Sequence, residues 1–442
     1  MSTIVALSTP IGRSAIAVVR LSGNLSLPIA KNLSPHLDNV KARRAILATI
    51  HYPQTDEILD QVLVTYFPGP HSVTGEDVVE ISCHGSSAVV RQLLDQALHL
   101  GARMAGPGEF TLRALTNGKI NLSQAEAIRD LIAAQTTAAA KQASRQVGGE
   151  LSIALAKFKK GLIRVIVVLE SALEFVEDDL PAAQSEELQN VLGSVRQGVS
   201  ELAESYGAGR FLQDGIKVAI VGSPNVGKSS LFNSLSEQDR AIVTDIPGTT
   251  RDTLTHSIDV GGVPVLLIDT AGLRETEDSI ETLGIARTMK AISDSDLVLN
   301  VVDGSLPREA HSHTEDVSRS ILVLNKCDLP QGSDYLENAD AIKVSALTGK
   351  GLEDLRAAIL QRINQDHNDL EGLLITNARQ HNLLSGATQE IDSALKLMKD
   401  RITEELILVP LQNALRYLDQ ITGETTTEDI LAEVFATFCI GK

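Results

Sequence analysis

Short apolar runs alternate with polar residues over the first 118 positions of the chain. Five of these runs predict β-strands, and SAVVRQLLDQALHL has the apolar spacing of a helix. Turn signals such as Pro68-Gly69-Pro70 and Gly106-Pro107-Gly108 separate the runs. The pattern predicts a small α+β domain over residues 1–118. The strand-like runs are TIVALST, AIAVVRLSG, ILATIHY, QVLVTYF and DVVEISC.

From Asn121 onward the apolar spacing becomes helical, and Leu122, Ala125, Ile128 and Ile132 share one face. After Gly148-Gly149, apolar residues recur every three or four positions over several turns, which predicts a long core-facing helix. That stripe consists of Leu151, Leu155, Phe158, Leu162, Val165, Leu169 and Leu173.

Residues 354–442 are helical again, with Pro410 inside a leucine stripe, either at a first-turn position or at a kink. Neither helical stretch can bury its apolar face alone. We therefore expect one helical domain, formed by residues 119–210 and 354–442, which is interrupted by an α/β domain at residues 211–353. The ends of the inserted domain should lie close together.

The inserted domain opens with KVAIVGSPNVGKSS, in which Gly222 to Ser229 fit G-x-x-x-x-G-K-[ST] between a strand and a helix. Such a loop points backbone N–H groups and a helix N-terminus at one anion. Lys228 would reach the terminal phosphates of a nucleotide, and the Ser229 hydroxyl would ligate Mg²⁺. The expected nucleotide-binding residues here are Asn225, Val226, Gly227, Lys228, Ser229 and Ser230.

Three further motifs each follow an apolar strand, and ligands bind at the carboxyl ends of parallel strands. Asp269-Thr270-Ala271-Gly272 offers a carboxylate for Mg²⁺ and a glycine N–H for a γ-phosphate. Asn325-Lys326-Cys327-Asp328 offers a carboxylate to the N1–H and 2-amino edge of guanine, which adenine lacks. Ser345-Ala346-Leu347 can give a backbone N–H to the guanine oxygen. The four motifs together predict a GTPase.

Between the first two motifs lies AIVTDIPGTTRD (241–252), which we interpret as a switch loop. In it Thr250 would complete the Mg²⁺ shell when GTP is bound. Leu273 follows the Asp-Thr-Ala-Gly motif where Ras-like enzymes carry a glutamine, so the acid or base for hydrolysis must come from elsewhere. The loop residues expected to contact GTP are Thr244, Asp245, Ile246, Pro247, Gly248, Thr249 and Thr250.

Length, charge and cysteine content limit which kinds of protein this chain can be. At 442 residues the chain should hold two to four domains. The net charge is −18, and residues 1–118 are balanced, so a broad basic surface that grips nucleic acid unaided is not expected. Three distant cysteines imply no disulfide framework, and no apolar run is long enough to span a bilayer. We expect a cytoplasmic protein.

Several strings are more specific than the nucleotide motifs: TGEDVVEISCHG (74–85), PGEFTLRA (107–114), NLSQAEAIRDLI (121–132), TDIPGTTRD (244–252) and Cys439-Ile440-Gly441-Lys442 at the end. In these strings and in the order of its segments, the chain resembles the tRNA modification GTPase family MnmE, also called TrmE. The likeness covers essentially the whole chain. It implies an N-terminal α+β domain similar to folate-binding one-carbon enzymes, a discontinuous all-α helical domain and an inserted Ras-like α/β P-loop GTPase domain.

The resemblance also implies site residues. Asn225, with Thr244, Ile246 and Thr249, would hold K⁺ in the place of an arginine finger, while two GTPase domains pair across their nucleotides. Glu281 would orient the attacking water. Arg20, Glu80, Lys119 and Lys442 would line a site for formyl- or methylene-tetrahydrofolate, with Cys439 near the folate and either reactive or buried. Pro247 departs from the alanine common in the K⁺ loop and favours an extended Ile246.

The implied activity is modification of the wobble uridine of tRNA at carbon 5, together with the flavin-containing protein MnmG, also called GidA. The N-terminal domain would form the homodimer. Two alternatives are a regulatory GTP switch that only recruits partners, and a ribosome-assembly GTPase of the Era type. The Era type carries a basic GXXG loop in a C-terminal RNA-binding domain, and nothing in this chain matches it.

Overall fold

The computed structural model describes residues 2–34, 37, 40–52, 55, 57–174, 182–237, 254–269, 292–306, 319–330, 341–364, 372–425 and 427–441. These residues form two compact units. The first unit contains residues 1–129 and 419–442, and the second contains residues 130–418. Among the described residues, no helix is both long enough and apolar enough to cross a membrane.

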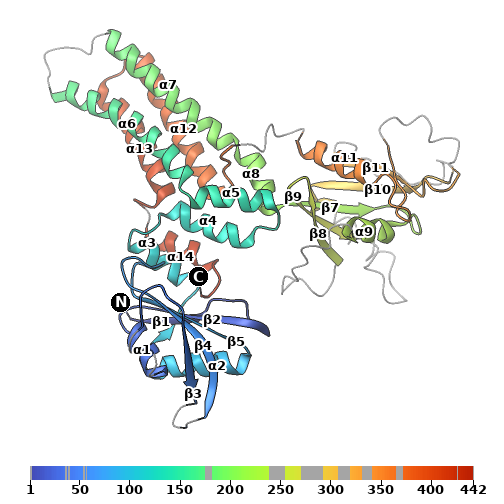
Figure 1. Cartoon of the computed structure of the whole chain (residues 1–442). Coiled ribbons are helices and arrows are strands. Elements are labelled where there is room, and N and C mark those ends of the chain that lie inside the picture. Colours follow the sequence, from blue (N-terminus) through green and yellow to red (C-terminus); the bar gives the residue numbers. More distant parts are fainter. Residues whose placement is uncertain are drawn as a thin grey trace, which may run out of the picture. The chain divides into compact units, whose positions relative to one another are not determined.

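The first unit is built on a six-stranded sheet in the order β3-β4-β5-β2-β1-β6, antiparallel except for the β1–β6 pair (Figure 1). Every strand predicted within residues 1–118 is present, and so is the predicted helix. The elements are β1 (Ile4–Leu7), β2 (Ser14–Ser22), α1 (Ser26–Leu33), β3 (Ile46–His51), β4 (Ile58–Phe67), β5 (Val78–Gly85), α2 (Ser87–His99), β6 (Arg103–Met104), α3 (Glu109–Thr116), α4 (Leu122–Ala133) and α14 (Glu428–Ala436).

Alternation along the strands decides which side chains reach the core. Val19 and Leu21 of β2 and Ile81 of β5 are buried in one apolar cluster with residues of α1 and α2. The intervening positions Arg20 and Glu80 are paired in the β2–β5 register and are only partly buried. The helices therefore cover one face of the sheet, and these two charged residues belong to the other face.

The end of the chain returns to this first unit. Pro107 forms an isolated antiparallel bridge with Ile440, and the N–H of Gly108 donates to the carbonyl of Cys439 at 3.3 Å. Gly108 has φ +62°, and a Cβ there would lie 2.9 Å from atoms of Phe435 and Phe438. This close approach explains a glycine at Gly108, because both its backbone conformation and the space beside it exclude a side chain.

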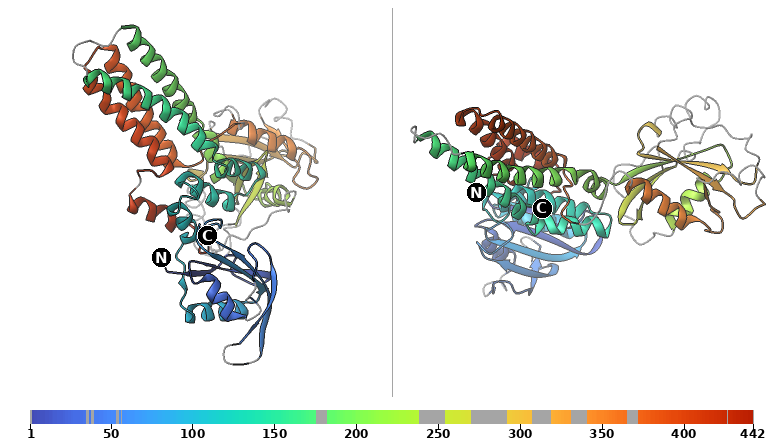
Figure 2. Two further views of the ribbon diagram at one scale, coloured as in Figure 1. Left: turned by 60° about the vertical axis from the view of Figure 1, so that its left-hand side comes forward. Right: turned by 90° about the horizontal axis from the view of Figure 1, so that it is seen from above.

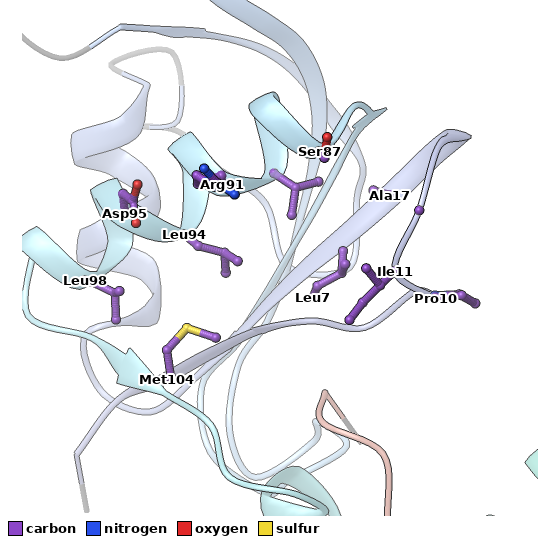
Figure 3. Close-up of a pocket in the computed structure, with 12 residues that line it drawn as sticks. Leu7, Pro10, Ile11, Ala17, Ser87, Arg91, Leu94, Asp95, Leu98 and Met104 are labelled. Carbon is purple, nitrogen blue, oxygen red and sulfur yellow. The ribbon is translucent and has the colours of Figure 1, made fainter. Parts of the chain in front are cut away.

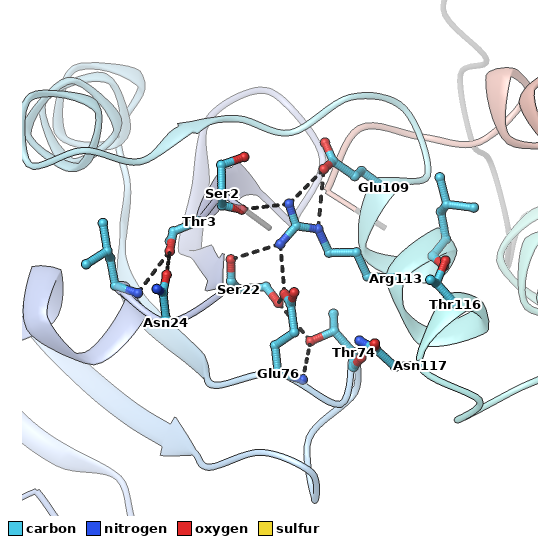
Figure 4. A network of polar contacts seen from close by, with 12 residues as sticks. Ser2, Thr3, Ser22, Asn24, Thr74, Glu76, Glu109, Arg113, Thr116 and Asn117 are labelled. Atoms are coloured by element: carbon cyan, nitrogen blue, oxygen red, sulfur yellow. Dashed lines mark hydrogen bonds and ion pairs between the residues drawn. The ribbon is translucent and has the colours of Figure 1, made fainter.

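Arg113 of α3 is a buried cation at the centre of a polar network (Figure 4). Its guanidinium forms ion pairs with Glu76 at 2.8 Å and with Glu109 at 2.9 Å, and it donates to the backbone oxygen of Ser2 at 2.8 Å. Arg103 forms a second ion pair with Glu109 at 2.5 Å. The network thus joins the beginning of the chain, α3 and the TGED segment through satisfied charges.

The second unit contains a six-stranded sheet in the order β12-β11-β10-β7-β9-β8, in which only β8 runs antiparallel to its neighbour (Figure 2). Helices α9 and α11 contribute to the same apolar cluster on the sheet. Its α/β elements are β7 (Ile216–Val221), α9 (Lys228–Glu237), β8 (Leu254–Val260), β9 (Val263–Asp269), β10 (Leu297–Asp303), β11 (Ser320–Asn325), β12 (Ile342–Lys343) and α11 (Leu352–Asn364). Because α11 packs on this sheet, the α/β fold extends past the predicted boundary at residue 353.

The helical stretches on either side of the sheet meet, as the apolar pattern predicts. Arg196 of α7 forms an ion pair with Asp392 of α12 at 2.9 Å. A Cβ on Gly209 would lie 2.0 Å from the carbonyl oxygen of Ile375, so the segments that flank the α/β elements are close together. The helices are α5 (Thr137–Val147), α6 (Glu150–Glu174), α7 (Ala182–Glu204), α8 (Tyr206–Asp214), α12 (Ala378–Lys399) and α13 (Glu404–Thr422).

Two details differ from the sequence pattern. Pro410 lies inside α13 and not in its first turn, so the first-turn alternative is wrong. Ile132 is 49% exposed although its spacing places it with Leu122 and Ala125, which are fully buried. The stripe of α6 is confirmed, with Leu151, Leu155, Leu162, Val165 and Leu169 all buried.

Candidate nucleotide-binding site

Strand register brings four of the predicted motifs to one edge of the second sheet. Ile220 of β7 pairs with Asp269 of β9, and Asp303 of β10 pairs with Asn325 of β11. These strands are parallel, so their carboxyl ends, and the loops that follow them, lie at the same edge.

The phosphate loop has the backbone that its sequence requires. Gly222, Asn225 and Gly227 have φ values of +148°, +64° and +95°. A Cβ on Gly222 would lie 2.1 Å from the carbonyl oxygen of Val301, and a Cβ on Gly227 would lie 2.3 Å from the Asn325 amide. Only glycine fits these two positions, and asparagine is a residue type that tolerates the left-handed conformation.

The cation and the hydroxyl of the loop are positioned for phosphate and metal. The Lys228 amine donates to the carbonyls of Gly222 at 3.0 Å and Ser223 at 2.9 Å, so it lies across the loop. The Ser229 hydroxyl donates to the carboxylate of Asp269 at 3.1 Å. One hydroxyl and one carboxylate at this distance fit a Mg²⁺ site in which the carboxylate acts directly or through water.

The base-side loops are held by their own hydrogen bonds. The Ser345 hydroxyl donates to the carboxylate of Asp328 at 2.6 Å and accepts from the Thr348 N–H at 3.2 Å. The Asn325 side chain accepts from the Ala346 N–H at 3.0 Å. Asp328 and the Ser345-Ala346-Leu347 loop are therefore neighbours, as guanine recognition from both motifs requires. Leu347 is 86% exposed beside them.

One ion pair at this edge is not among the features predicted from the sequence. The Lys326 amine lies 2.5 Å from the carboxylate of Asp303, which ends β10. Burial alone would raise the pKa of Asp303, but hydrogen bonds from Lys326 and Ser305 outweigh it and lower that pKa. The position of Asp303 in the sequence could have identified it as a residue of this edge, because Asp303 follows an apolar strand in the same way as Asp269 does.

Several predicted residues lie outside the described part of the chain. These are Thr244, Asp245, Ile246, Pro247, Gly248, Thr249, Thr250, Thr270, Ala271, Gly272, Glu281 and Lys442. Their assignments stay predictions.

Comparison with known proteins covers both units. The family model of the MnmE helical domain matches residues 122–439, and that of the GTP-binding protein TrmE N-terminus matches residues 3–119. The tRNA modification GTPase MnmE of Koribacter versatilis is 44% identical over 100% of this chain and 99% of its own length. The chain belongs to the MnmE family. MnmE proteins of Aquifex aeolicus and Nitrosomonas europaea are 40% and 42% identical, each over 99% of its own length.

Family membership confirms the predicted fold class, with an N-terminal α+β domain, a helical domain and a P-loop GTPase domain. It also confirms the prediction of a GTP-hydrolysing enzyme, because the chain matches MnmE GTPases over its whole length and carries a fitting nucleotide site.

Three of the four residues that the MnmE resemblance assigns to folate, Arg20, Glu80 and Lys119, lie in the described part of the first unit. The Arg20 guanidinium forms an ion pair with Glu80 at 2.8 Å and lies 5.7 Å from the centre of the Phe110 ring. Side-chain carbons of Lys119 lie 3.4 Å from where a Cβ on Gly75 would stand. A carboxylate paired with a guanidinium beside an aromatic ring offers groups that fit the polar edge and the anionic tail of a folate.

The cysteines differ in environment. Cys439 is exposed, which excludes the buried alternative. Burial, reinforced by the charge of Asp60, raises the pKa of the Cys83 thiol to about 11, so it stays protonated.

A cavity of about 380 Å³ lies elsewhere in this unit, between α2 and the loop after β1 (Figure 3). Its lining includes Leu7, Ile11, Leu94 and Met104, and none of the residues assigned to folate. Ile11 is 95% exposed. The cavity is therefore a mainly apolar depression separate from the predicted folate residues.

Proposed function

We propose that this protein is a GTP-hydrolysing tRNA modification factor. With a FAD-containing partner of the MnmG (GidA) type, it installs an aminomethyl or carboxymethylaminomethyl group at carbon 5 of the wobble uridine of certain tRNAs. The observation that carries the proposal is the convergence of Lys228, Ser229, Asp269 and Asp328 at one sheet edge in a chain that matches MnmE proteins over its full length.

In the nucleotide site, backbone N–H groups of the phosphate loop and the Lys228 amine bind the phosphates, and the Asp328 carboxylate selects guanine. Ser229 and Thr250 hold Mg²⁺, which neutralises phosphate charge. Asn225 would hold K⁺ together with Thr244, Ile246 and Thr249, and its left-handed backbone within the phosphate loop is the described feature on which this assignment rests. Glu281 orients the water that attacks the γ-phosphate.

The one-carbon unit comes from a formyl- or methylene-tetrahydrofolate held by Arg20, Glu80, Lys119 and Lys442. The short contact between the Arg20 and Glu80 side chains supports this assignment, since a ligand can exchange that ion pair for its own polar groups. We infer that Cys439 lies near this ligand, because Cys439 bonds to Gly108 beside α3, the helix that carries Phe110.

The protein acts as a homodimer through its N-terminal domain, in the cytoplasm, and hydrolysis drives pairing and opening of the GTPase domains. The exposed Ile11 beside the apolar cavity supports self-association, because a second copy would remove this side chain from water.

Mass spectrometry of tRNA from cells that lack the protein tests the proposal. We expect the modified wobble uridine to be lost, and to return with the wild-type chain but not with Glu281→Ala. Normal modification in the deleted cells would contradict the proposal. Binding of 5-formyltetrahydrofolate to the full chain separates it from a purely regulatory switch, because a switch needs no folate.

A further inference from the structure

Helix α5 contacts the nucleotide-binding part of the second unit through its N-cap. The Thr136 hydroxyl accepts from the Ala139 N–H at 3.2 Å and donates to the carbonyl of Gly262 at 2.7 Å. Thr136 is only 4% exposed. One hydroxyl thus caps the helix and binds the turn between β8 and β9.

The contact continues along this hairpin. The Ser257 hydroxyl of β8 donates to the Gln135 side chain at 2.6 Å. A Cβ on Gly262, which has φ +91°, would lie 2.9 Å from the Ala138 side chain. The turn between β8 and β9 and the first turn of α5 are therefore in close contact, next to the hydrogen bonds that Thr136 and Ser257 donate.

Both outer ends of the β8–β9 hairpin lead to the nucleotide site. Strand β9 ends at Asp269, which accepts the hydrogen bond of Ser229 in the phosphate-loop helix. Strand β8 begins at Leu254, two positions after the end of the predicted switch loop at 241–252. A nucleotide-dependent change at either end therefore acts on the hairpin whose turn is bound to α5.

Two glutamines further along α5 hold the segment that leads into the helical bundle. The side-chain amides of Gln142 and Gln146 both donate to the carbonyl of Leu374, at 2.9 and 2.8 Å, and both residues are buried. The N–H of Ile375 donates to the Ser205 hydroxyl at 3.0 Å, just after α7. Residues 374–376 run directly into α12, which forms an ion pair with α7.

We propose that α5 couples the nucleotide state to the helical bundle, with Thr136 as the contact to the hairpin and Gln142 and Gln146 as the contacts to residues 374–376. A short helix bound at one end and along one side moves as one body, so a shift of the hairpin is passed to the start of α12. The proposal goes beyond the proposed function, and it requires a guanine-nucleotide cycle but neither folate nor tRNA.

Hydrogen–deuterium exchange of the full chain tests this coupling. The wild-type protein is compared with GDP alone and with GDP plus aluminium fluoride, both with Mg²⁺ and K⁺. We expect exchange at residues 137–147 and 372–378 to differ between the two states by threefold or more. Equal exchange of both segments in the two states would overturn the proposal without any variant.

Two substitutions then locate the contact. Thr136→Asp keeps an oxygen that caps α5 but has no proton to donate to Gly262, whereas Thr136→Ser keeps both bonds. We expect Thr136→Asp to abolish the state difference at 372–378 while the difference at the phosphate loop and the GTP turnover stay within twofold of wild type. Thr136→Ser should behave as wild type.

Retention of the full state difference at 372–378 in Thr136→Asp would overturn the assignment of Thr136. If Thr136→Asp unfolds α5, Gly262→Ala takes its place, since a methyl group at φ +91° strains the turn and displaces it from Ala138, while the bond between Thr136 and the Ala139 N–H is untouched. We then expect Gly262→Ala to abolish the difference in exchange at 372–378 between the two nucleotide states. Retention of the full difference in that variant would overturn the assignment of this contact.

Discussion

Asn325 joins the phosphate loop to the base-side loop. Its side-chain nitrogen donates to the carbonyl of Val226 at 2.8 Å, and its side-chain oxygen accepts from the Ala346 N–H at 3.0 Å. Asn325 is 2% exposed. One buried amide therefore sets the separation between the residues that bind phosphate and those that bind guanine.

Asn325→Ala should weaken GTP binding by roughly tenfold or more, because two hydrogen bonds of about 1 kcal/mol each are lost and the Val226 carbonyl stays buried. Titration with a fluorescent GTP analogue measures the effect. Asn413→Ala is the matched control, since its amide lies 3.5 Å from Glu390 in the helical bundle, and it should bind GTP normally. Equal affinity of Asn325→Ala and wild type would contradict this role.

The dependence of GTP turnover on K⁺ should require the Asn225 side chain. Replacement of K⁺ by Na⁺ should slow GTP turnover by tenfold or more. Asn225→Gly keeps a residue that tolerates φ +64° but removes the side-chain oxygen, so its turnover should be slow and equal in both salts. Phosphate release in KCl and NaCl checks both statements. Equal wild-type rates in the two salts would remove the K⁺ assignment.

Glu281→Ala should leave GTP affinity within about threefold and lower single-turnover hydrolysis by about 100-fold or more, the size of effect typical of a general acid or base. Glu275→Ala, in the same acidic segment, serves as the control and should hydrolyse GTP normally. Normal hydrolysis by the Glu281 variant would disprove its assignment.

The Arg113 network predicts that the folding stability of the first unit depends on pH. Burial raises the pKa of Glu109, but hydrogen bonds from Arg103, the Gly106 N–H and Arg113 outweigh it and lower that pKa to about 2. Because this value lies below the ordinary value of 4.5, the ionised carboxylate stabilises the folded state fully above pH 5. That stabilisation is lost as the pH falls from 4.5 through 2.

Glu109→Gln should therefore lower the free energy of unfolding of this unit by about 2 kcal/mol at pH 7, after allowance for the partly exposed Arg103. The difference from wild type should shrink steadily below pH 4.5. Hydrogen exchange of β2 and β5 measured against urea gives the free energy. The exposed Glu187→Gln serves as control and should change it by less than about 0.5 kcal/mol. A pH-independent difference would disagree with the lowered pKa.

Local patterns predicted much of the fold. The run AIAVVRLSG predicted a strand, and the structure buries its alternate residues Val19 and Leu21, while the spacing in α6 identified its buried leucines. The nucleotide motifs were predictable because phosphate, Mg²⁺ and guanine each demand particular residue types at the end of a strand.

Contacts between distant segments were not predictable in the same way. Nothing in the periodicity of the last 24 residues shows that they group with residues 1–129, because a helical stripe does not specify its partner. The bond from Thr136 to Gly262 likewise joins a common helix cap to a common turn. Asp303 could have been predicted from its strand-end position, although its pairing with Lys326 depends on the neighbouring strand.

The nucleotide specificity of Asp328→Asn tests the central claim most directly. In the wild-type chain the Asp328 carboxylate lies beside the Ser345-Ala346-Leu347 loop, where it would accept both hydrogen bonds of guanine. Hydrolysis of GTP and of xanthosine triphosphate is measured for both proteins under the same conditions. We predict that wild type prefers GTP and that Asp328→Asn prefers xanthosine triphosphate. An unchanged preference for GTP in the variant would contradict the account.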